Sequence, residues 1–408
     1  MRGRPASAIL AAQVRGANRR HERRMLGIAA PTIGFIVVFF ALPLCLFLFR
    51  SIDNPEVHNT LSRTLGALGD WDRKSLPDER AFAALVSDLS AARGTPQLTT
   101  LARRLNYDMA GFRSIIIRTA RLADEAAPPF KEWLTAREPA WGDIATWGAI
   151  RNEAAPLTDF YLLGALDLRR AAGGDIVRVD SQNAVFLDLF ARTFWISFTV
   201  TALCLLIGFP VAAVIAHAKP ETANVLLILV LLPFWSSLLV RATAWIILLQ
   251  DEGLVNQALV AIGLIDHPVK LIFNRIGLTI SMTHVLLPFM ILPLTSVLKG
   301  IPREHMRAAA SLGARPVEAF FRVYLPQALP GVVAGSTLVF VISLGYYVAP
   351  ALVGGPGDQM IGYFVAYFTS STANWGMASA LGTILLAIVV LLYLSLARLV
   401  GFDRLKVR

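Results

Sequence analysis

The sequence has few charged residues for its length. Asp, Glu, Lys and Arg make up 16% of the 408 residues, whereas hydrophobic residues make up 55%. Soluble globular chains carry about 25% charged residues. This deficit excludes an ordinary soluble domain, because so much apolar surface needs a solvent other than water.

Cysteine and catalytic motifs are equally scarce. The only two cysteines, Cys45 and Cys204, lie in apolar stretches, where they act as small hydrophobes and not as a disulfide framework. The six histidines are scattered without the spacing of metal ligands. No GxxxxGK[ST] motif and no pairing of nucleophile and base appears. The sequence therefore predicts a non-enzymatic chain with no catalytic residues, metal or cofactor of its own.

Long apolar runs are abundant instead. A membrane-spanning helix needs about 20 apolar residues. Six stretches qualify: Leu26–Phe49, Thr193–Ala216, Val225–Leu249, Ile276–Leu298, Gly331–Leu352 and Ala380–Val400. The first is too long for a signal-peptide core and lacks a cleavage site, so we expect it to be retained. The sequence predicts an all-α polytopic membrane protein with six transmembrane helices and both termini on one side.

The basic residues indicate which side that is. Cytoplasmic flanks are enriched in Lys and Arg, and the segment Val353–Ser379 contains neither. In the short segments that flank the spans, basic residues gather in both tails and in one loop: Arg15, Arg19, Arg20, Arg23, Arg24, Lys299, Arg303, Arg307, Arg315, Arg322, Arg398, Arg404, Lys406 and Arg408. We therefore expect cytoplasmic termini. The net charge of +10 follows largely from this sidedness, and no nucleic-acid partner is expected.

The chain divides into predicted segments. Basic tails cover 1–25 and 401–408, the first span covers 26–49, and the apolar core covers 189–400 with a cytoplasmic loop at 299–330. Residues 50–188 have helical periodicity interrupted at Pro77-Asp78, Gly94-Thr95-Pro96 and Pro128-Pro129. This insert follows a span that exits outward, so it is predicted to be a helical extracytoplasmic domain.

The cytoplasmic loop predicts a helix, a turn at Gly313 and a second short helix. The second helix begins at Pro316 and is expected to end at Pro326. Ala308 and Ala309 leave a nearly bare backbone that another protein can approach closely. The alternative is a hairpin lying on lipid headgroups, which the basic residues would suit.

This loop resembles the permease subunits of binding-protein-dependent ABC importers. Their loop carries Glu-Ala-Ala, three residues, Gly, and later Leu-Pro; here Ala308, Ala309, Gly313 and Leu325-Pro326 match, while Arg307 replaces Glu. Further stretches look like the spermidine/putrescine branch: RTFWISFTV from 192, LVRATAWIILLQDEGLVN from 239, LLPFMILPL from 286 and LPGVVAGSTLVF from 329.

The resemblance implies a location, partners and a cargo. It implies the bacterial inner membrane, two ATP-binding subunits that hold ATP and Mg²⁺, a second homologous permease subunit and a periplasmic substrate-binding protein. In this branch a heterodimer of permeases is more usual than a homodimer. Polyamines lead as cargo, with opines, other amines, phosphonates and ferric ion as alternatives. The insert either helps to dock the binding protein or only stabilises the fold.

Two groups of site residues follow. The resemblance implies that the ATPase-coupling loop includes Arg307, Ala308, Ala309, Leu312, Gly313, Ala314, Phe320, Leu325 and Pro326. Intramembrane charge, carboxylates for ammonium groups and aromatic rings for cation-π contact suggest a translocation path. Its candidates are Trp235, Ser236, Arg241, Trp245, Asp251, Glu252, Tyr346, Tyr347 and Asp358, although each is also an ordinary anchor or loop residue.

An ion-coupled carrier is the main competing class. Such carriers tend to hold Asp, Glu or His inside their spans. Here no acidic residue lies within a predicted span, and His284 stands alone. An integral membrane enzyme fits less well, because no catalytic constellation is present.

Overall fold

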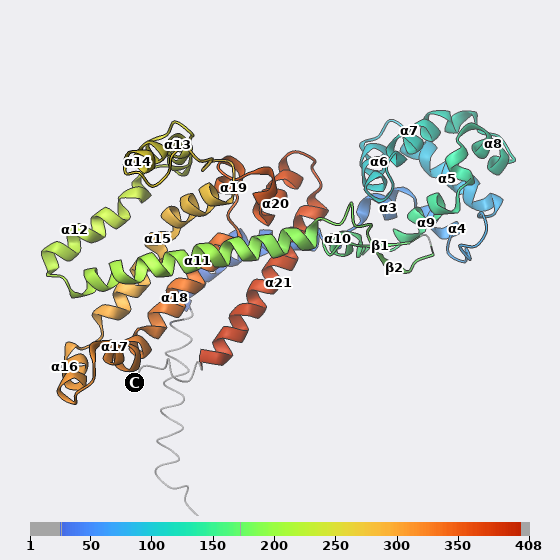
Figure 1. Cartoon of the computed structure of the whole chain (residues 1–408). Coiled ribbons are helices and arrows are strands. Elements are labelled where there is room, and N and C mark those ends of the chain that lie inside the picture. Colours follow the sequence, from blue (N-terminus) through green and yellow to red (C-terminus); the bar gives the residue numbers. More distant parts are fainter. Residues whose placement is uncertain (1–24, 26, 172, 401–408) are drawn as a thin grey trace, which may run out of the picture. The chain divides into compact units, whose positions relative to one another are not determined.

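The protein is described here by a computed structural model that covers residues 25, 27–171 and 173–400 (Figure 1). The predicted basic tails at 1–25 and 401–408 lie, apart from Met25, outside the described residues. The described chain is helical except for one short hairpin, which confirms the predicted all-α class. It forms two compact units, one ending at Asp159 and the other beginning at Phe160.

The first unit starts with an apolar helix, Gly27–Phe49, of mean hydropathy 2.7. It contains a π turn, η1 (Val37–Ala41), followed by α2 (Leu42–Phe49). Its side chains are exposed, with Phe39 and Phe40 both at 68%. An exposed helix of this composition is suited to lipid or to another membrane protein.

The rest of the first unit is a small helical domain. Its elements are α3 (Pro55–Thr60), α4 (Ser62–Ala67), α5 (Glu79–Ala92), α6 (Pro96–Asp108), α7 (Phe112–Leu122), η2 (Ala123–Glu125), α8 (Phe130–Arg137), η3 (Pro139–Gly142) and α9 (Ile144–Asn152). Phe82, Trp141 and Trp147 are fully buried, with ring centroids 4.6 Å apart for Phe82 and Trp147. The indole of Trp147 donates to the carbonyl of Trp141 at 2.9 Å, so its buried N–H is satisfied. Helices break at the predicted Pro and Gly positions.

The second unit contains the long apolar helices. Its elements are α10 (Phe160–Gly164), β1 (Leu168–Arg170), β2 (Ile176–Arg178), α11 (Phe186–His217), α12 (Pro220–Leu231), η4 (Leu232–Trp235), α13 (Leu238–Leu249), α14 (Leu254–Ala261), α15 (Arg275–Lys299), α16 (Arg303–Ser311), α17 (Pro316–Ala319), η5 (Phe320–Tyr324), α18 (Leu325–Leu344), α19 (Val348–Leu352), η6 (Pro356–Asp358), α20 (Ile361–Ser370) and α21 (Trp375–Val400). The predicted insert ran to 188, whereas the structure groups residues from Phe160 onward with this unit.

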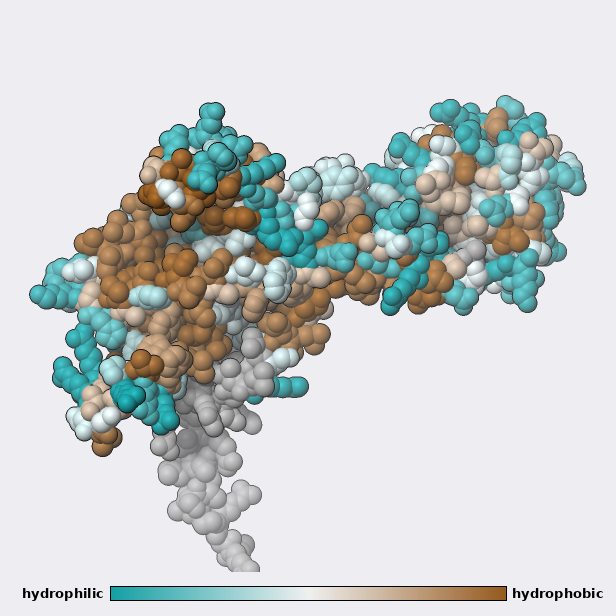
Figure 2. All heavy atoms as spheres, viewed as in Figure 1, coloured by the Kyte–Doolittle hydropathy of each residue, from teal (hydrophilic) through white to brown (hydrophobic). Residues whose placement is uncertain are grey.

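Three helices, α11, α15 and α18, form the core of this unit (Figure 1). Gly208 of α11 and Gly335 of α18 both face Met290 of α15; an added Cβ would lie 3.0 and 2.9 Å from its side chain. Small residues let helix backbones approach closely where no hydrophobic effect drives association. Figure 2 shows a largely hydrophobic outer surface over these helices, in keeping with a bilayer environment.

Two predicted spans differ from the structure. The described residues contain five helices long and apolar enough to cross a membrane, or six if one bent pair counts as a span. That pair, Pro220–Trp235 and Leu238–Ala261, bends by 96°, so the predicted span Val225–Leu249 is broken in the structure and is not one continuous helix. The predicted span Gly331–Leu352 is part of a helix over Pro316–Leu344 and breaks at Gly345 before α19.

Candidate functional site

The loop around Gly313 lies at one end of the second unit (Figure 1). The helix α16 ends in a turn, and α17 then continues through the π turn η5 into α18. In the turn, the amide of Ala314 donates to the carbonyl of Ala309 at 3.1 Å, and that of Gly313 donates to Ala310 at 3.0 Å. This is a Schellman motif, which needs a left-handed residue after the helix. Gly313 supplies it with φ of +84°.

The outward side of this loop is open and partly apolar. Leu312 is 88% exposed, Val317 68% and Phe321 60%. No atom lies within 4 Å of the place where a Cβ on Gly313 would sit, and Ala308 and Arg307 are exposed beside it. Exposed apolar side chains rimmed by polar ones are typical of a protein-contact site.

The inward side of the loop anchors it to the helices. Ala309 and Ala319 are buried, and Phe320 packs edge-on against Phe209 of α11 with centroids 6.0 Å apart. Leu325 is half-buried and Pro326 is exposed at the start of α18. The expectation that Pro326 ends the second helix was wrong, because the helix continues to Leu344. The π turn η5 just before Pro326 has wider, i→i+5 hydrogen bonding. This moves the preceding carbonyls away from the proline ring, which would otherwise clash with the carbonyl four residues before it.

The bend in the third apolar segment places Trp235 and Ser236 at a break. Trp235 is 80% exposed, while the Ser236 hydroxyl donates to the carbonyl of Pro233 at 2.8 Å. Ser237 caps α13 by accepting from the amide of Val240 at 3.2 Å. Irregular backbone at membrane depth is tolerated where it is covered by protein or lines a water-filled cavity.

Arg241, Trp245, His284 and Tyr346 form a polar group inside the second unit. The Trp245 indole donates to Nδ1 of His284 at 3.2 Å, so His284 does not stand alone. The Arg241 guanidinium lies 5.8 Å from the centroid of Phe234 and in the neighbourhood of His284 and Tyr346. Its Nε and the Tyr346 hydroxyl are buried without a hydrogen-bond partner among the described residues.

The remaining path candidates lie at the end opposite the Gly313 loop (Figure 1). Asp251 and Glu252 are exposed in the turn between α13 and α14, and Tyr347 is 48% exposed. The structure thus brings Arg241, Trp245 and Tyr346 together, and leaves Asp251 and Glu252 open to solvent.

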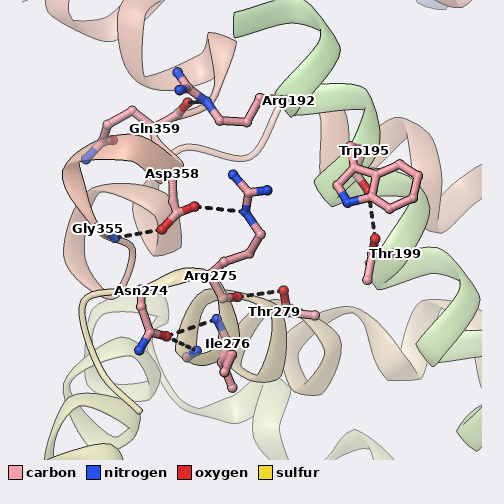
Figure 3. Close-up of polar contacts among 11 residues, drawn as sticks. Arg192, Trp195, Thr199, Asn274, Arg275, Ile276, Thr279, Gly355, Asp358 and Gln359 are labelled. Carbon is pink, nitrogen blue, oxygen red and sulfur yellow. Dashed lines mark hydrogen bonds and ion pairs between the residues drawn. The ribbon is translucent and has the colours of Figure 1, made fainter. Parts of the chain in front are cut away.

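Asp358 differs from these, because its carboxylate is already engaged (Figure 3). Its Oδ1 accepts from Nε of Arg275 at 2.9 Å, and its Oδ2 accepts from the amide of Gly355 at 3.3 Å. Beside it, Nε of Arg192 donates to the carbonyl of Gln359 at 2.9 Å. Asp358 therefore ties the segment before α20 to α15, and a cationic solute would have to compete with Arg275 for it.

The apolar core matches a known family model. Residues 194–403 match the binding-protein-dependent transport system inner membrane component. This range covers the Gly313 loop and every path candidate. The chain belongs to this family. The permease's N-terminal helix and the helical domain up to Asp159 lie outside the matched range.

Three relatives illustrate the range of the family. The permease is 32% identical over 224 residues to the spermidine/putrescine transport system permease protein PotB of Haemophilus influenzae, covering 53% of this chain and 78% of that protein. It is 34% identical to the inner membrane ABC transporter permease protein YdcU of Escherichia coli, covering 55% and 75%. It is 32% identical to the molybdenum transport system permease protein ModB of Mycobacterium bovis, covering 44% and 64%.

Sequence reasoning missed two arginines beside the helix α20, Arg192 and Arg275, as functional residues. Arg192 and Arg275 flank apolar stretches, and a positive-inside count treats such residues only as topology markers. Their contacts with Asp358 and Gln359, which lie far away in the sequence, come from tertiary packing. Among the described residues there is no group of three or more His, Cys, Asp or Glu side chains that could hold a metal ion.

Proposed function

We propose that this importer subunit moves a polyamine such as putrescine or spermidine across the inner membrane. The likeness to a spermidine/putrescine permease at 32% identity carries the proposal. The exposed carboxylates of Asp251 and Glu252 and the rings of Trp235 and Tyr347 suit an ammonium-bearing solute. These groups lie at the end of the bundle opposite the Gly313 loop (Figure 1).

The loop around Gly313 is the docking site for a separate ATPase in this proposal. Its support is an open, apolar outward face on a rigid glycine turn that is anchored through Phe320. The ATPase subunits hold the ATP and Mg²⁺. The loop and both termini then face the cytoplasm, and the insert faces outward. The exposed helix Gly27–Phe49 offers apolar surface for a second permease subunit or lipid, and a periplasmic binding protein delivers the solute.

A small oxyanion is the second candidate cargo. The guanidinium of Arg241 lies near His284 and Tyr346, and its Nε has no hydrogen-bond partner among the described residues. A fixed positive charge within the path would attract an anion and repel a polyamine. The relative named for molybdenum transport points the same way. Opines, other amines, phosphonates and ferric ion stay as alternative cargoes, and the family match gives no support to an ion-coupled carrier.

Transport by the reconstituted complex with its co-encoded partners tests the cargo. Putrescine, spermidine and molybdate are supplied with the binding protein, and uptake and ATP hydrolysis are measured for each. We expect ATP-dependent uptake of putrescine or spermidine. Uptake of molybdate but of neither polyamine would show that the cargo is an oxyanion. In that case Arg241→Gln should reduce molybdate uptake while the complex still assembles.

A further inference from the structure

The coupling loop follows α15 in the chain and is connected to the other two core helices in different ways. It runs without interruption through η5 into α18, so its link to α18 is covalent and helical. Nδ1 of His305 also lies 2.8 Å from Oε1 of Gln327 on α18. Its link to α11 is entirely non-covalent. A displacement of the loop reaches α11 through the packing of α15 and α18 against it, and directly through the side chains that join the loop to α11.

One of those side chains is Arg303, in the first turn of α16. Its guanidinium donates to the carbonyl of His217 at 2.7 Å. His217 is the last residue of α11, whose terminal carbonyls have no donor within the helix. A cation at this place satisfies one of them and interacts favourably with the negative end of the helix dipole. Because the acceptor belongs to the backbone, Arg303 is the partner that a substitution can remove.

Four aromatic rings make the second connection. Phe209 of α11 meets Phe320 edge-on at 6.0 Å, Phe320 stacks on Tyr324 at 5.8 Å, and Tyr324 lies 5.9 Å from the ring of His217. The row therefore begins and ends on α11 and passes through the π turn of the loop. Aromatic pairs of this kind contribute beyond the area that they bury.

We propose that Arg303 and this row of rings act as a clamp that makes α11 move with the coupling loop. Arg303 is a positioning residue, because it acts on α11 and touches neither solute nor nucleotide. The inference rests on the proposed docking of the ATPase to this loop. It adds that a nucleotide-driven movement of the loop acts on α11 directly, and not only through the packing of α11 on α15 and α18.

Distances between spin labels test the clamp. Labels are placed through Ser311→Cys on α16 and Lys219→Cys after the end of α11, in a protein whose Cys45 and Cys204 are replaced by Ala. The assembled complex is measured without nucleotide and with ATP and vanadate. We expect one narrow distance in both states. Arg303→Ala combined with Phe320→Ala should lose it and give a broad distribution.

Matched variants separate a clamp from a general loss of structure. Arg303→Lys keeps a cation and should retain the narrow distance, and Arg315→Ala, which removes an exposed arginine in the same loop, should leave it unchanged. Solute moved per ATP hydrolysed should fall about tenfold in Arg303→Ala, the effect of losing one charged hydrogen bond. An unchanged distance distribution in the double variant would overturn the inference. If the ATPase fails to bind the wild-type permease, the docking proposal fails, while the nucleotide-free distances still decide the clamp.

Discussion

At the scale of single residues, the helical domain holds an unbalanced group of buried charges. Arg104 is ion-paired with Asp108 at 2.9 Å and with Glu153 at 2.7 Å, and the Arg104 and Glu153 side chains are 2% and 3% exposed. Two carboxylates thus share one guanidinium. Burial raises the pKa of Asp108 to about 7, Glu153 pushes in the same direction, and Arg104 opposes both.

The stability of this domain should therefore depend on pH in an unusual direction. The pKa of Asp108 is raised from its ordinary 3.8, so its proton favours the folded state. This contribution is complete below about pH 4 and is lost as pH rises through about 7, on the order of 4 kcal/mol at most. The temperature at which residues 51–159 become sensitive to protease should fall between pH 5 and pH 8.

Asp108→Asn should remove most of this dependence and make the domain more stable than wild type at pH 8, because Arg104 then faces one carboxylate. Asp124→Asn provides the control, since Asp124 pairs with Arg93 in an exposed ion pair. If the temperature of protease sensitivity fell more steeply between pH 5 and pH 8 in Asp108→Asn than in wild type, the buried carboxylate of Asp108 would be stabilising the fold.

A substitution of Arg307 tests how strongly the proposed ATPase binding depends on one charge in the Gly313 loop. It is exposed on α16 and replaces the Glu of the family pattern. A charge at the rim of an interface mainly affects the rate of association. We therefore expect Arg307→Glu to change the affinity for the ATPase by less than about tenfold. Binding of the ATPase subunit to the detergent-purified permease measures this. Complete loss of binding would place Arg307 at the centre of the contact.

At the scale of elements, two π turns each precede a proline that does not end its helix, and one of these prolines, Pro326, was wrongly predicted to do so. One π turn ends at Ala41, two residues before Pro43, and the other ends at Tyr324, two residues before Pro326. In both places the chain carries Leu-Pro and the helix continues. The sequence marks the proline correctly, but it does not reveal that one wider turn removes the conflict with the preceding carbonyl.

Close packing of α18 on α15 depends on Gly335. A Cβ there would lie 2.9 Å from Sδ and 3.2 Å from the carbonyl oxygen of Met290. Gly335→Leu should therefore separate the helices and destabilise the permease by roughly 1–3 kcal/mol, seen as a lower thermal unfolding midpoint in detergent. Gly345→Ala is the control, because its nearest atom would be 3.9 Å away. Equal midpoints for both variants would show that Met290 moves aside without cost.

At the scale of the whole molecule, hydropathy predicted the number of apolar segments better than their direction. Val225–Leu249 is largely apolar, yet the chain turns by 96° within it. A hydropathy count averages composition and does not detect the non-helical residues at Ser236 and Ser237. The family pattern predicted the loop at Gly313, because a left-handed turn needs glycine at a fixed position. The contacts of Asp358 and His284 depend on tertiary packing that the local sequence does not encode.

The proposed orientation can be checked by labelling. Ser311→Cys lies on the coupling loop and Ser114→Cys on the helical domain, and both positions are exposed. With the native cysteines replaced, an impermeant thiol reagent should label Ser114→Cys in intact spheroplasts and Ser311→Cys only after lysis. The reverse pattern would invert the topology and move the Gly313 loop away from any cytoplasmic ATPase.

Coupling at Gly313 is the central claim, and ATP hydrolysis by the reconstituted complex tests it most directly. Gly313 needs φ of +84°, which Asn adopts far more readily than Leu. With substrate-loaded binding protein present, wild type and Gly313→Asn should both hydrolyse ATP faster than without it. Gly313→Leu should insert into the membrane normally but lose that stimulation. Full stimulation in Gly313→Leu would contradict the assignment of this loop as the coupling site.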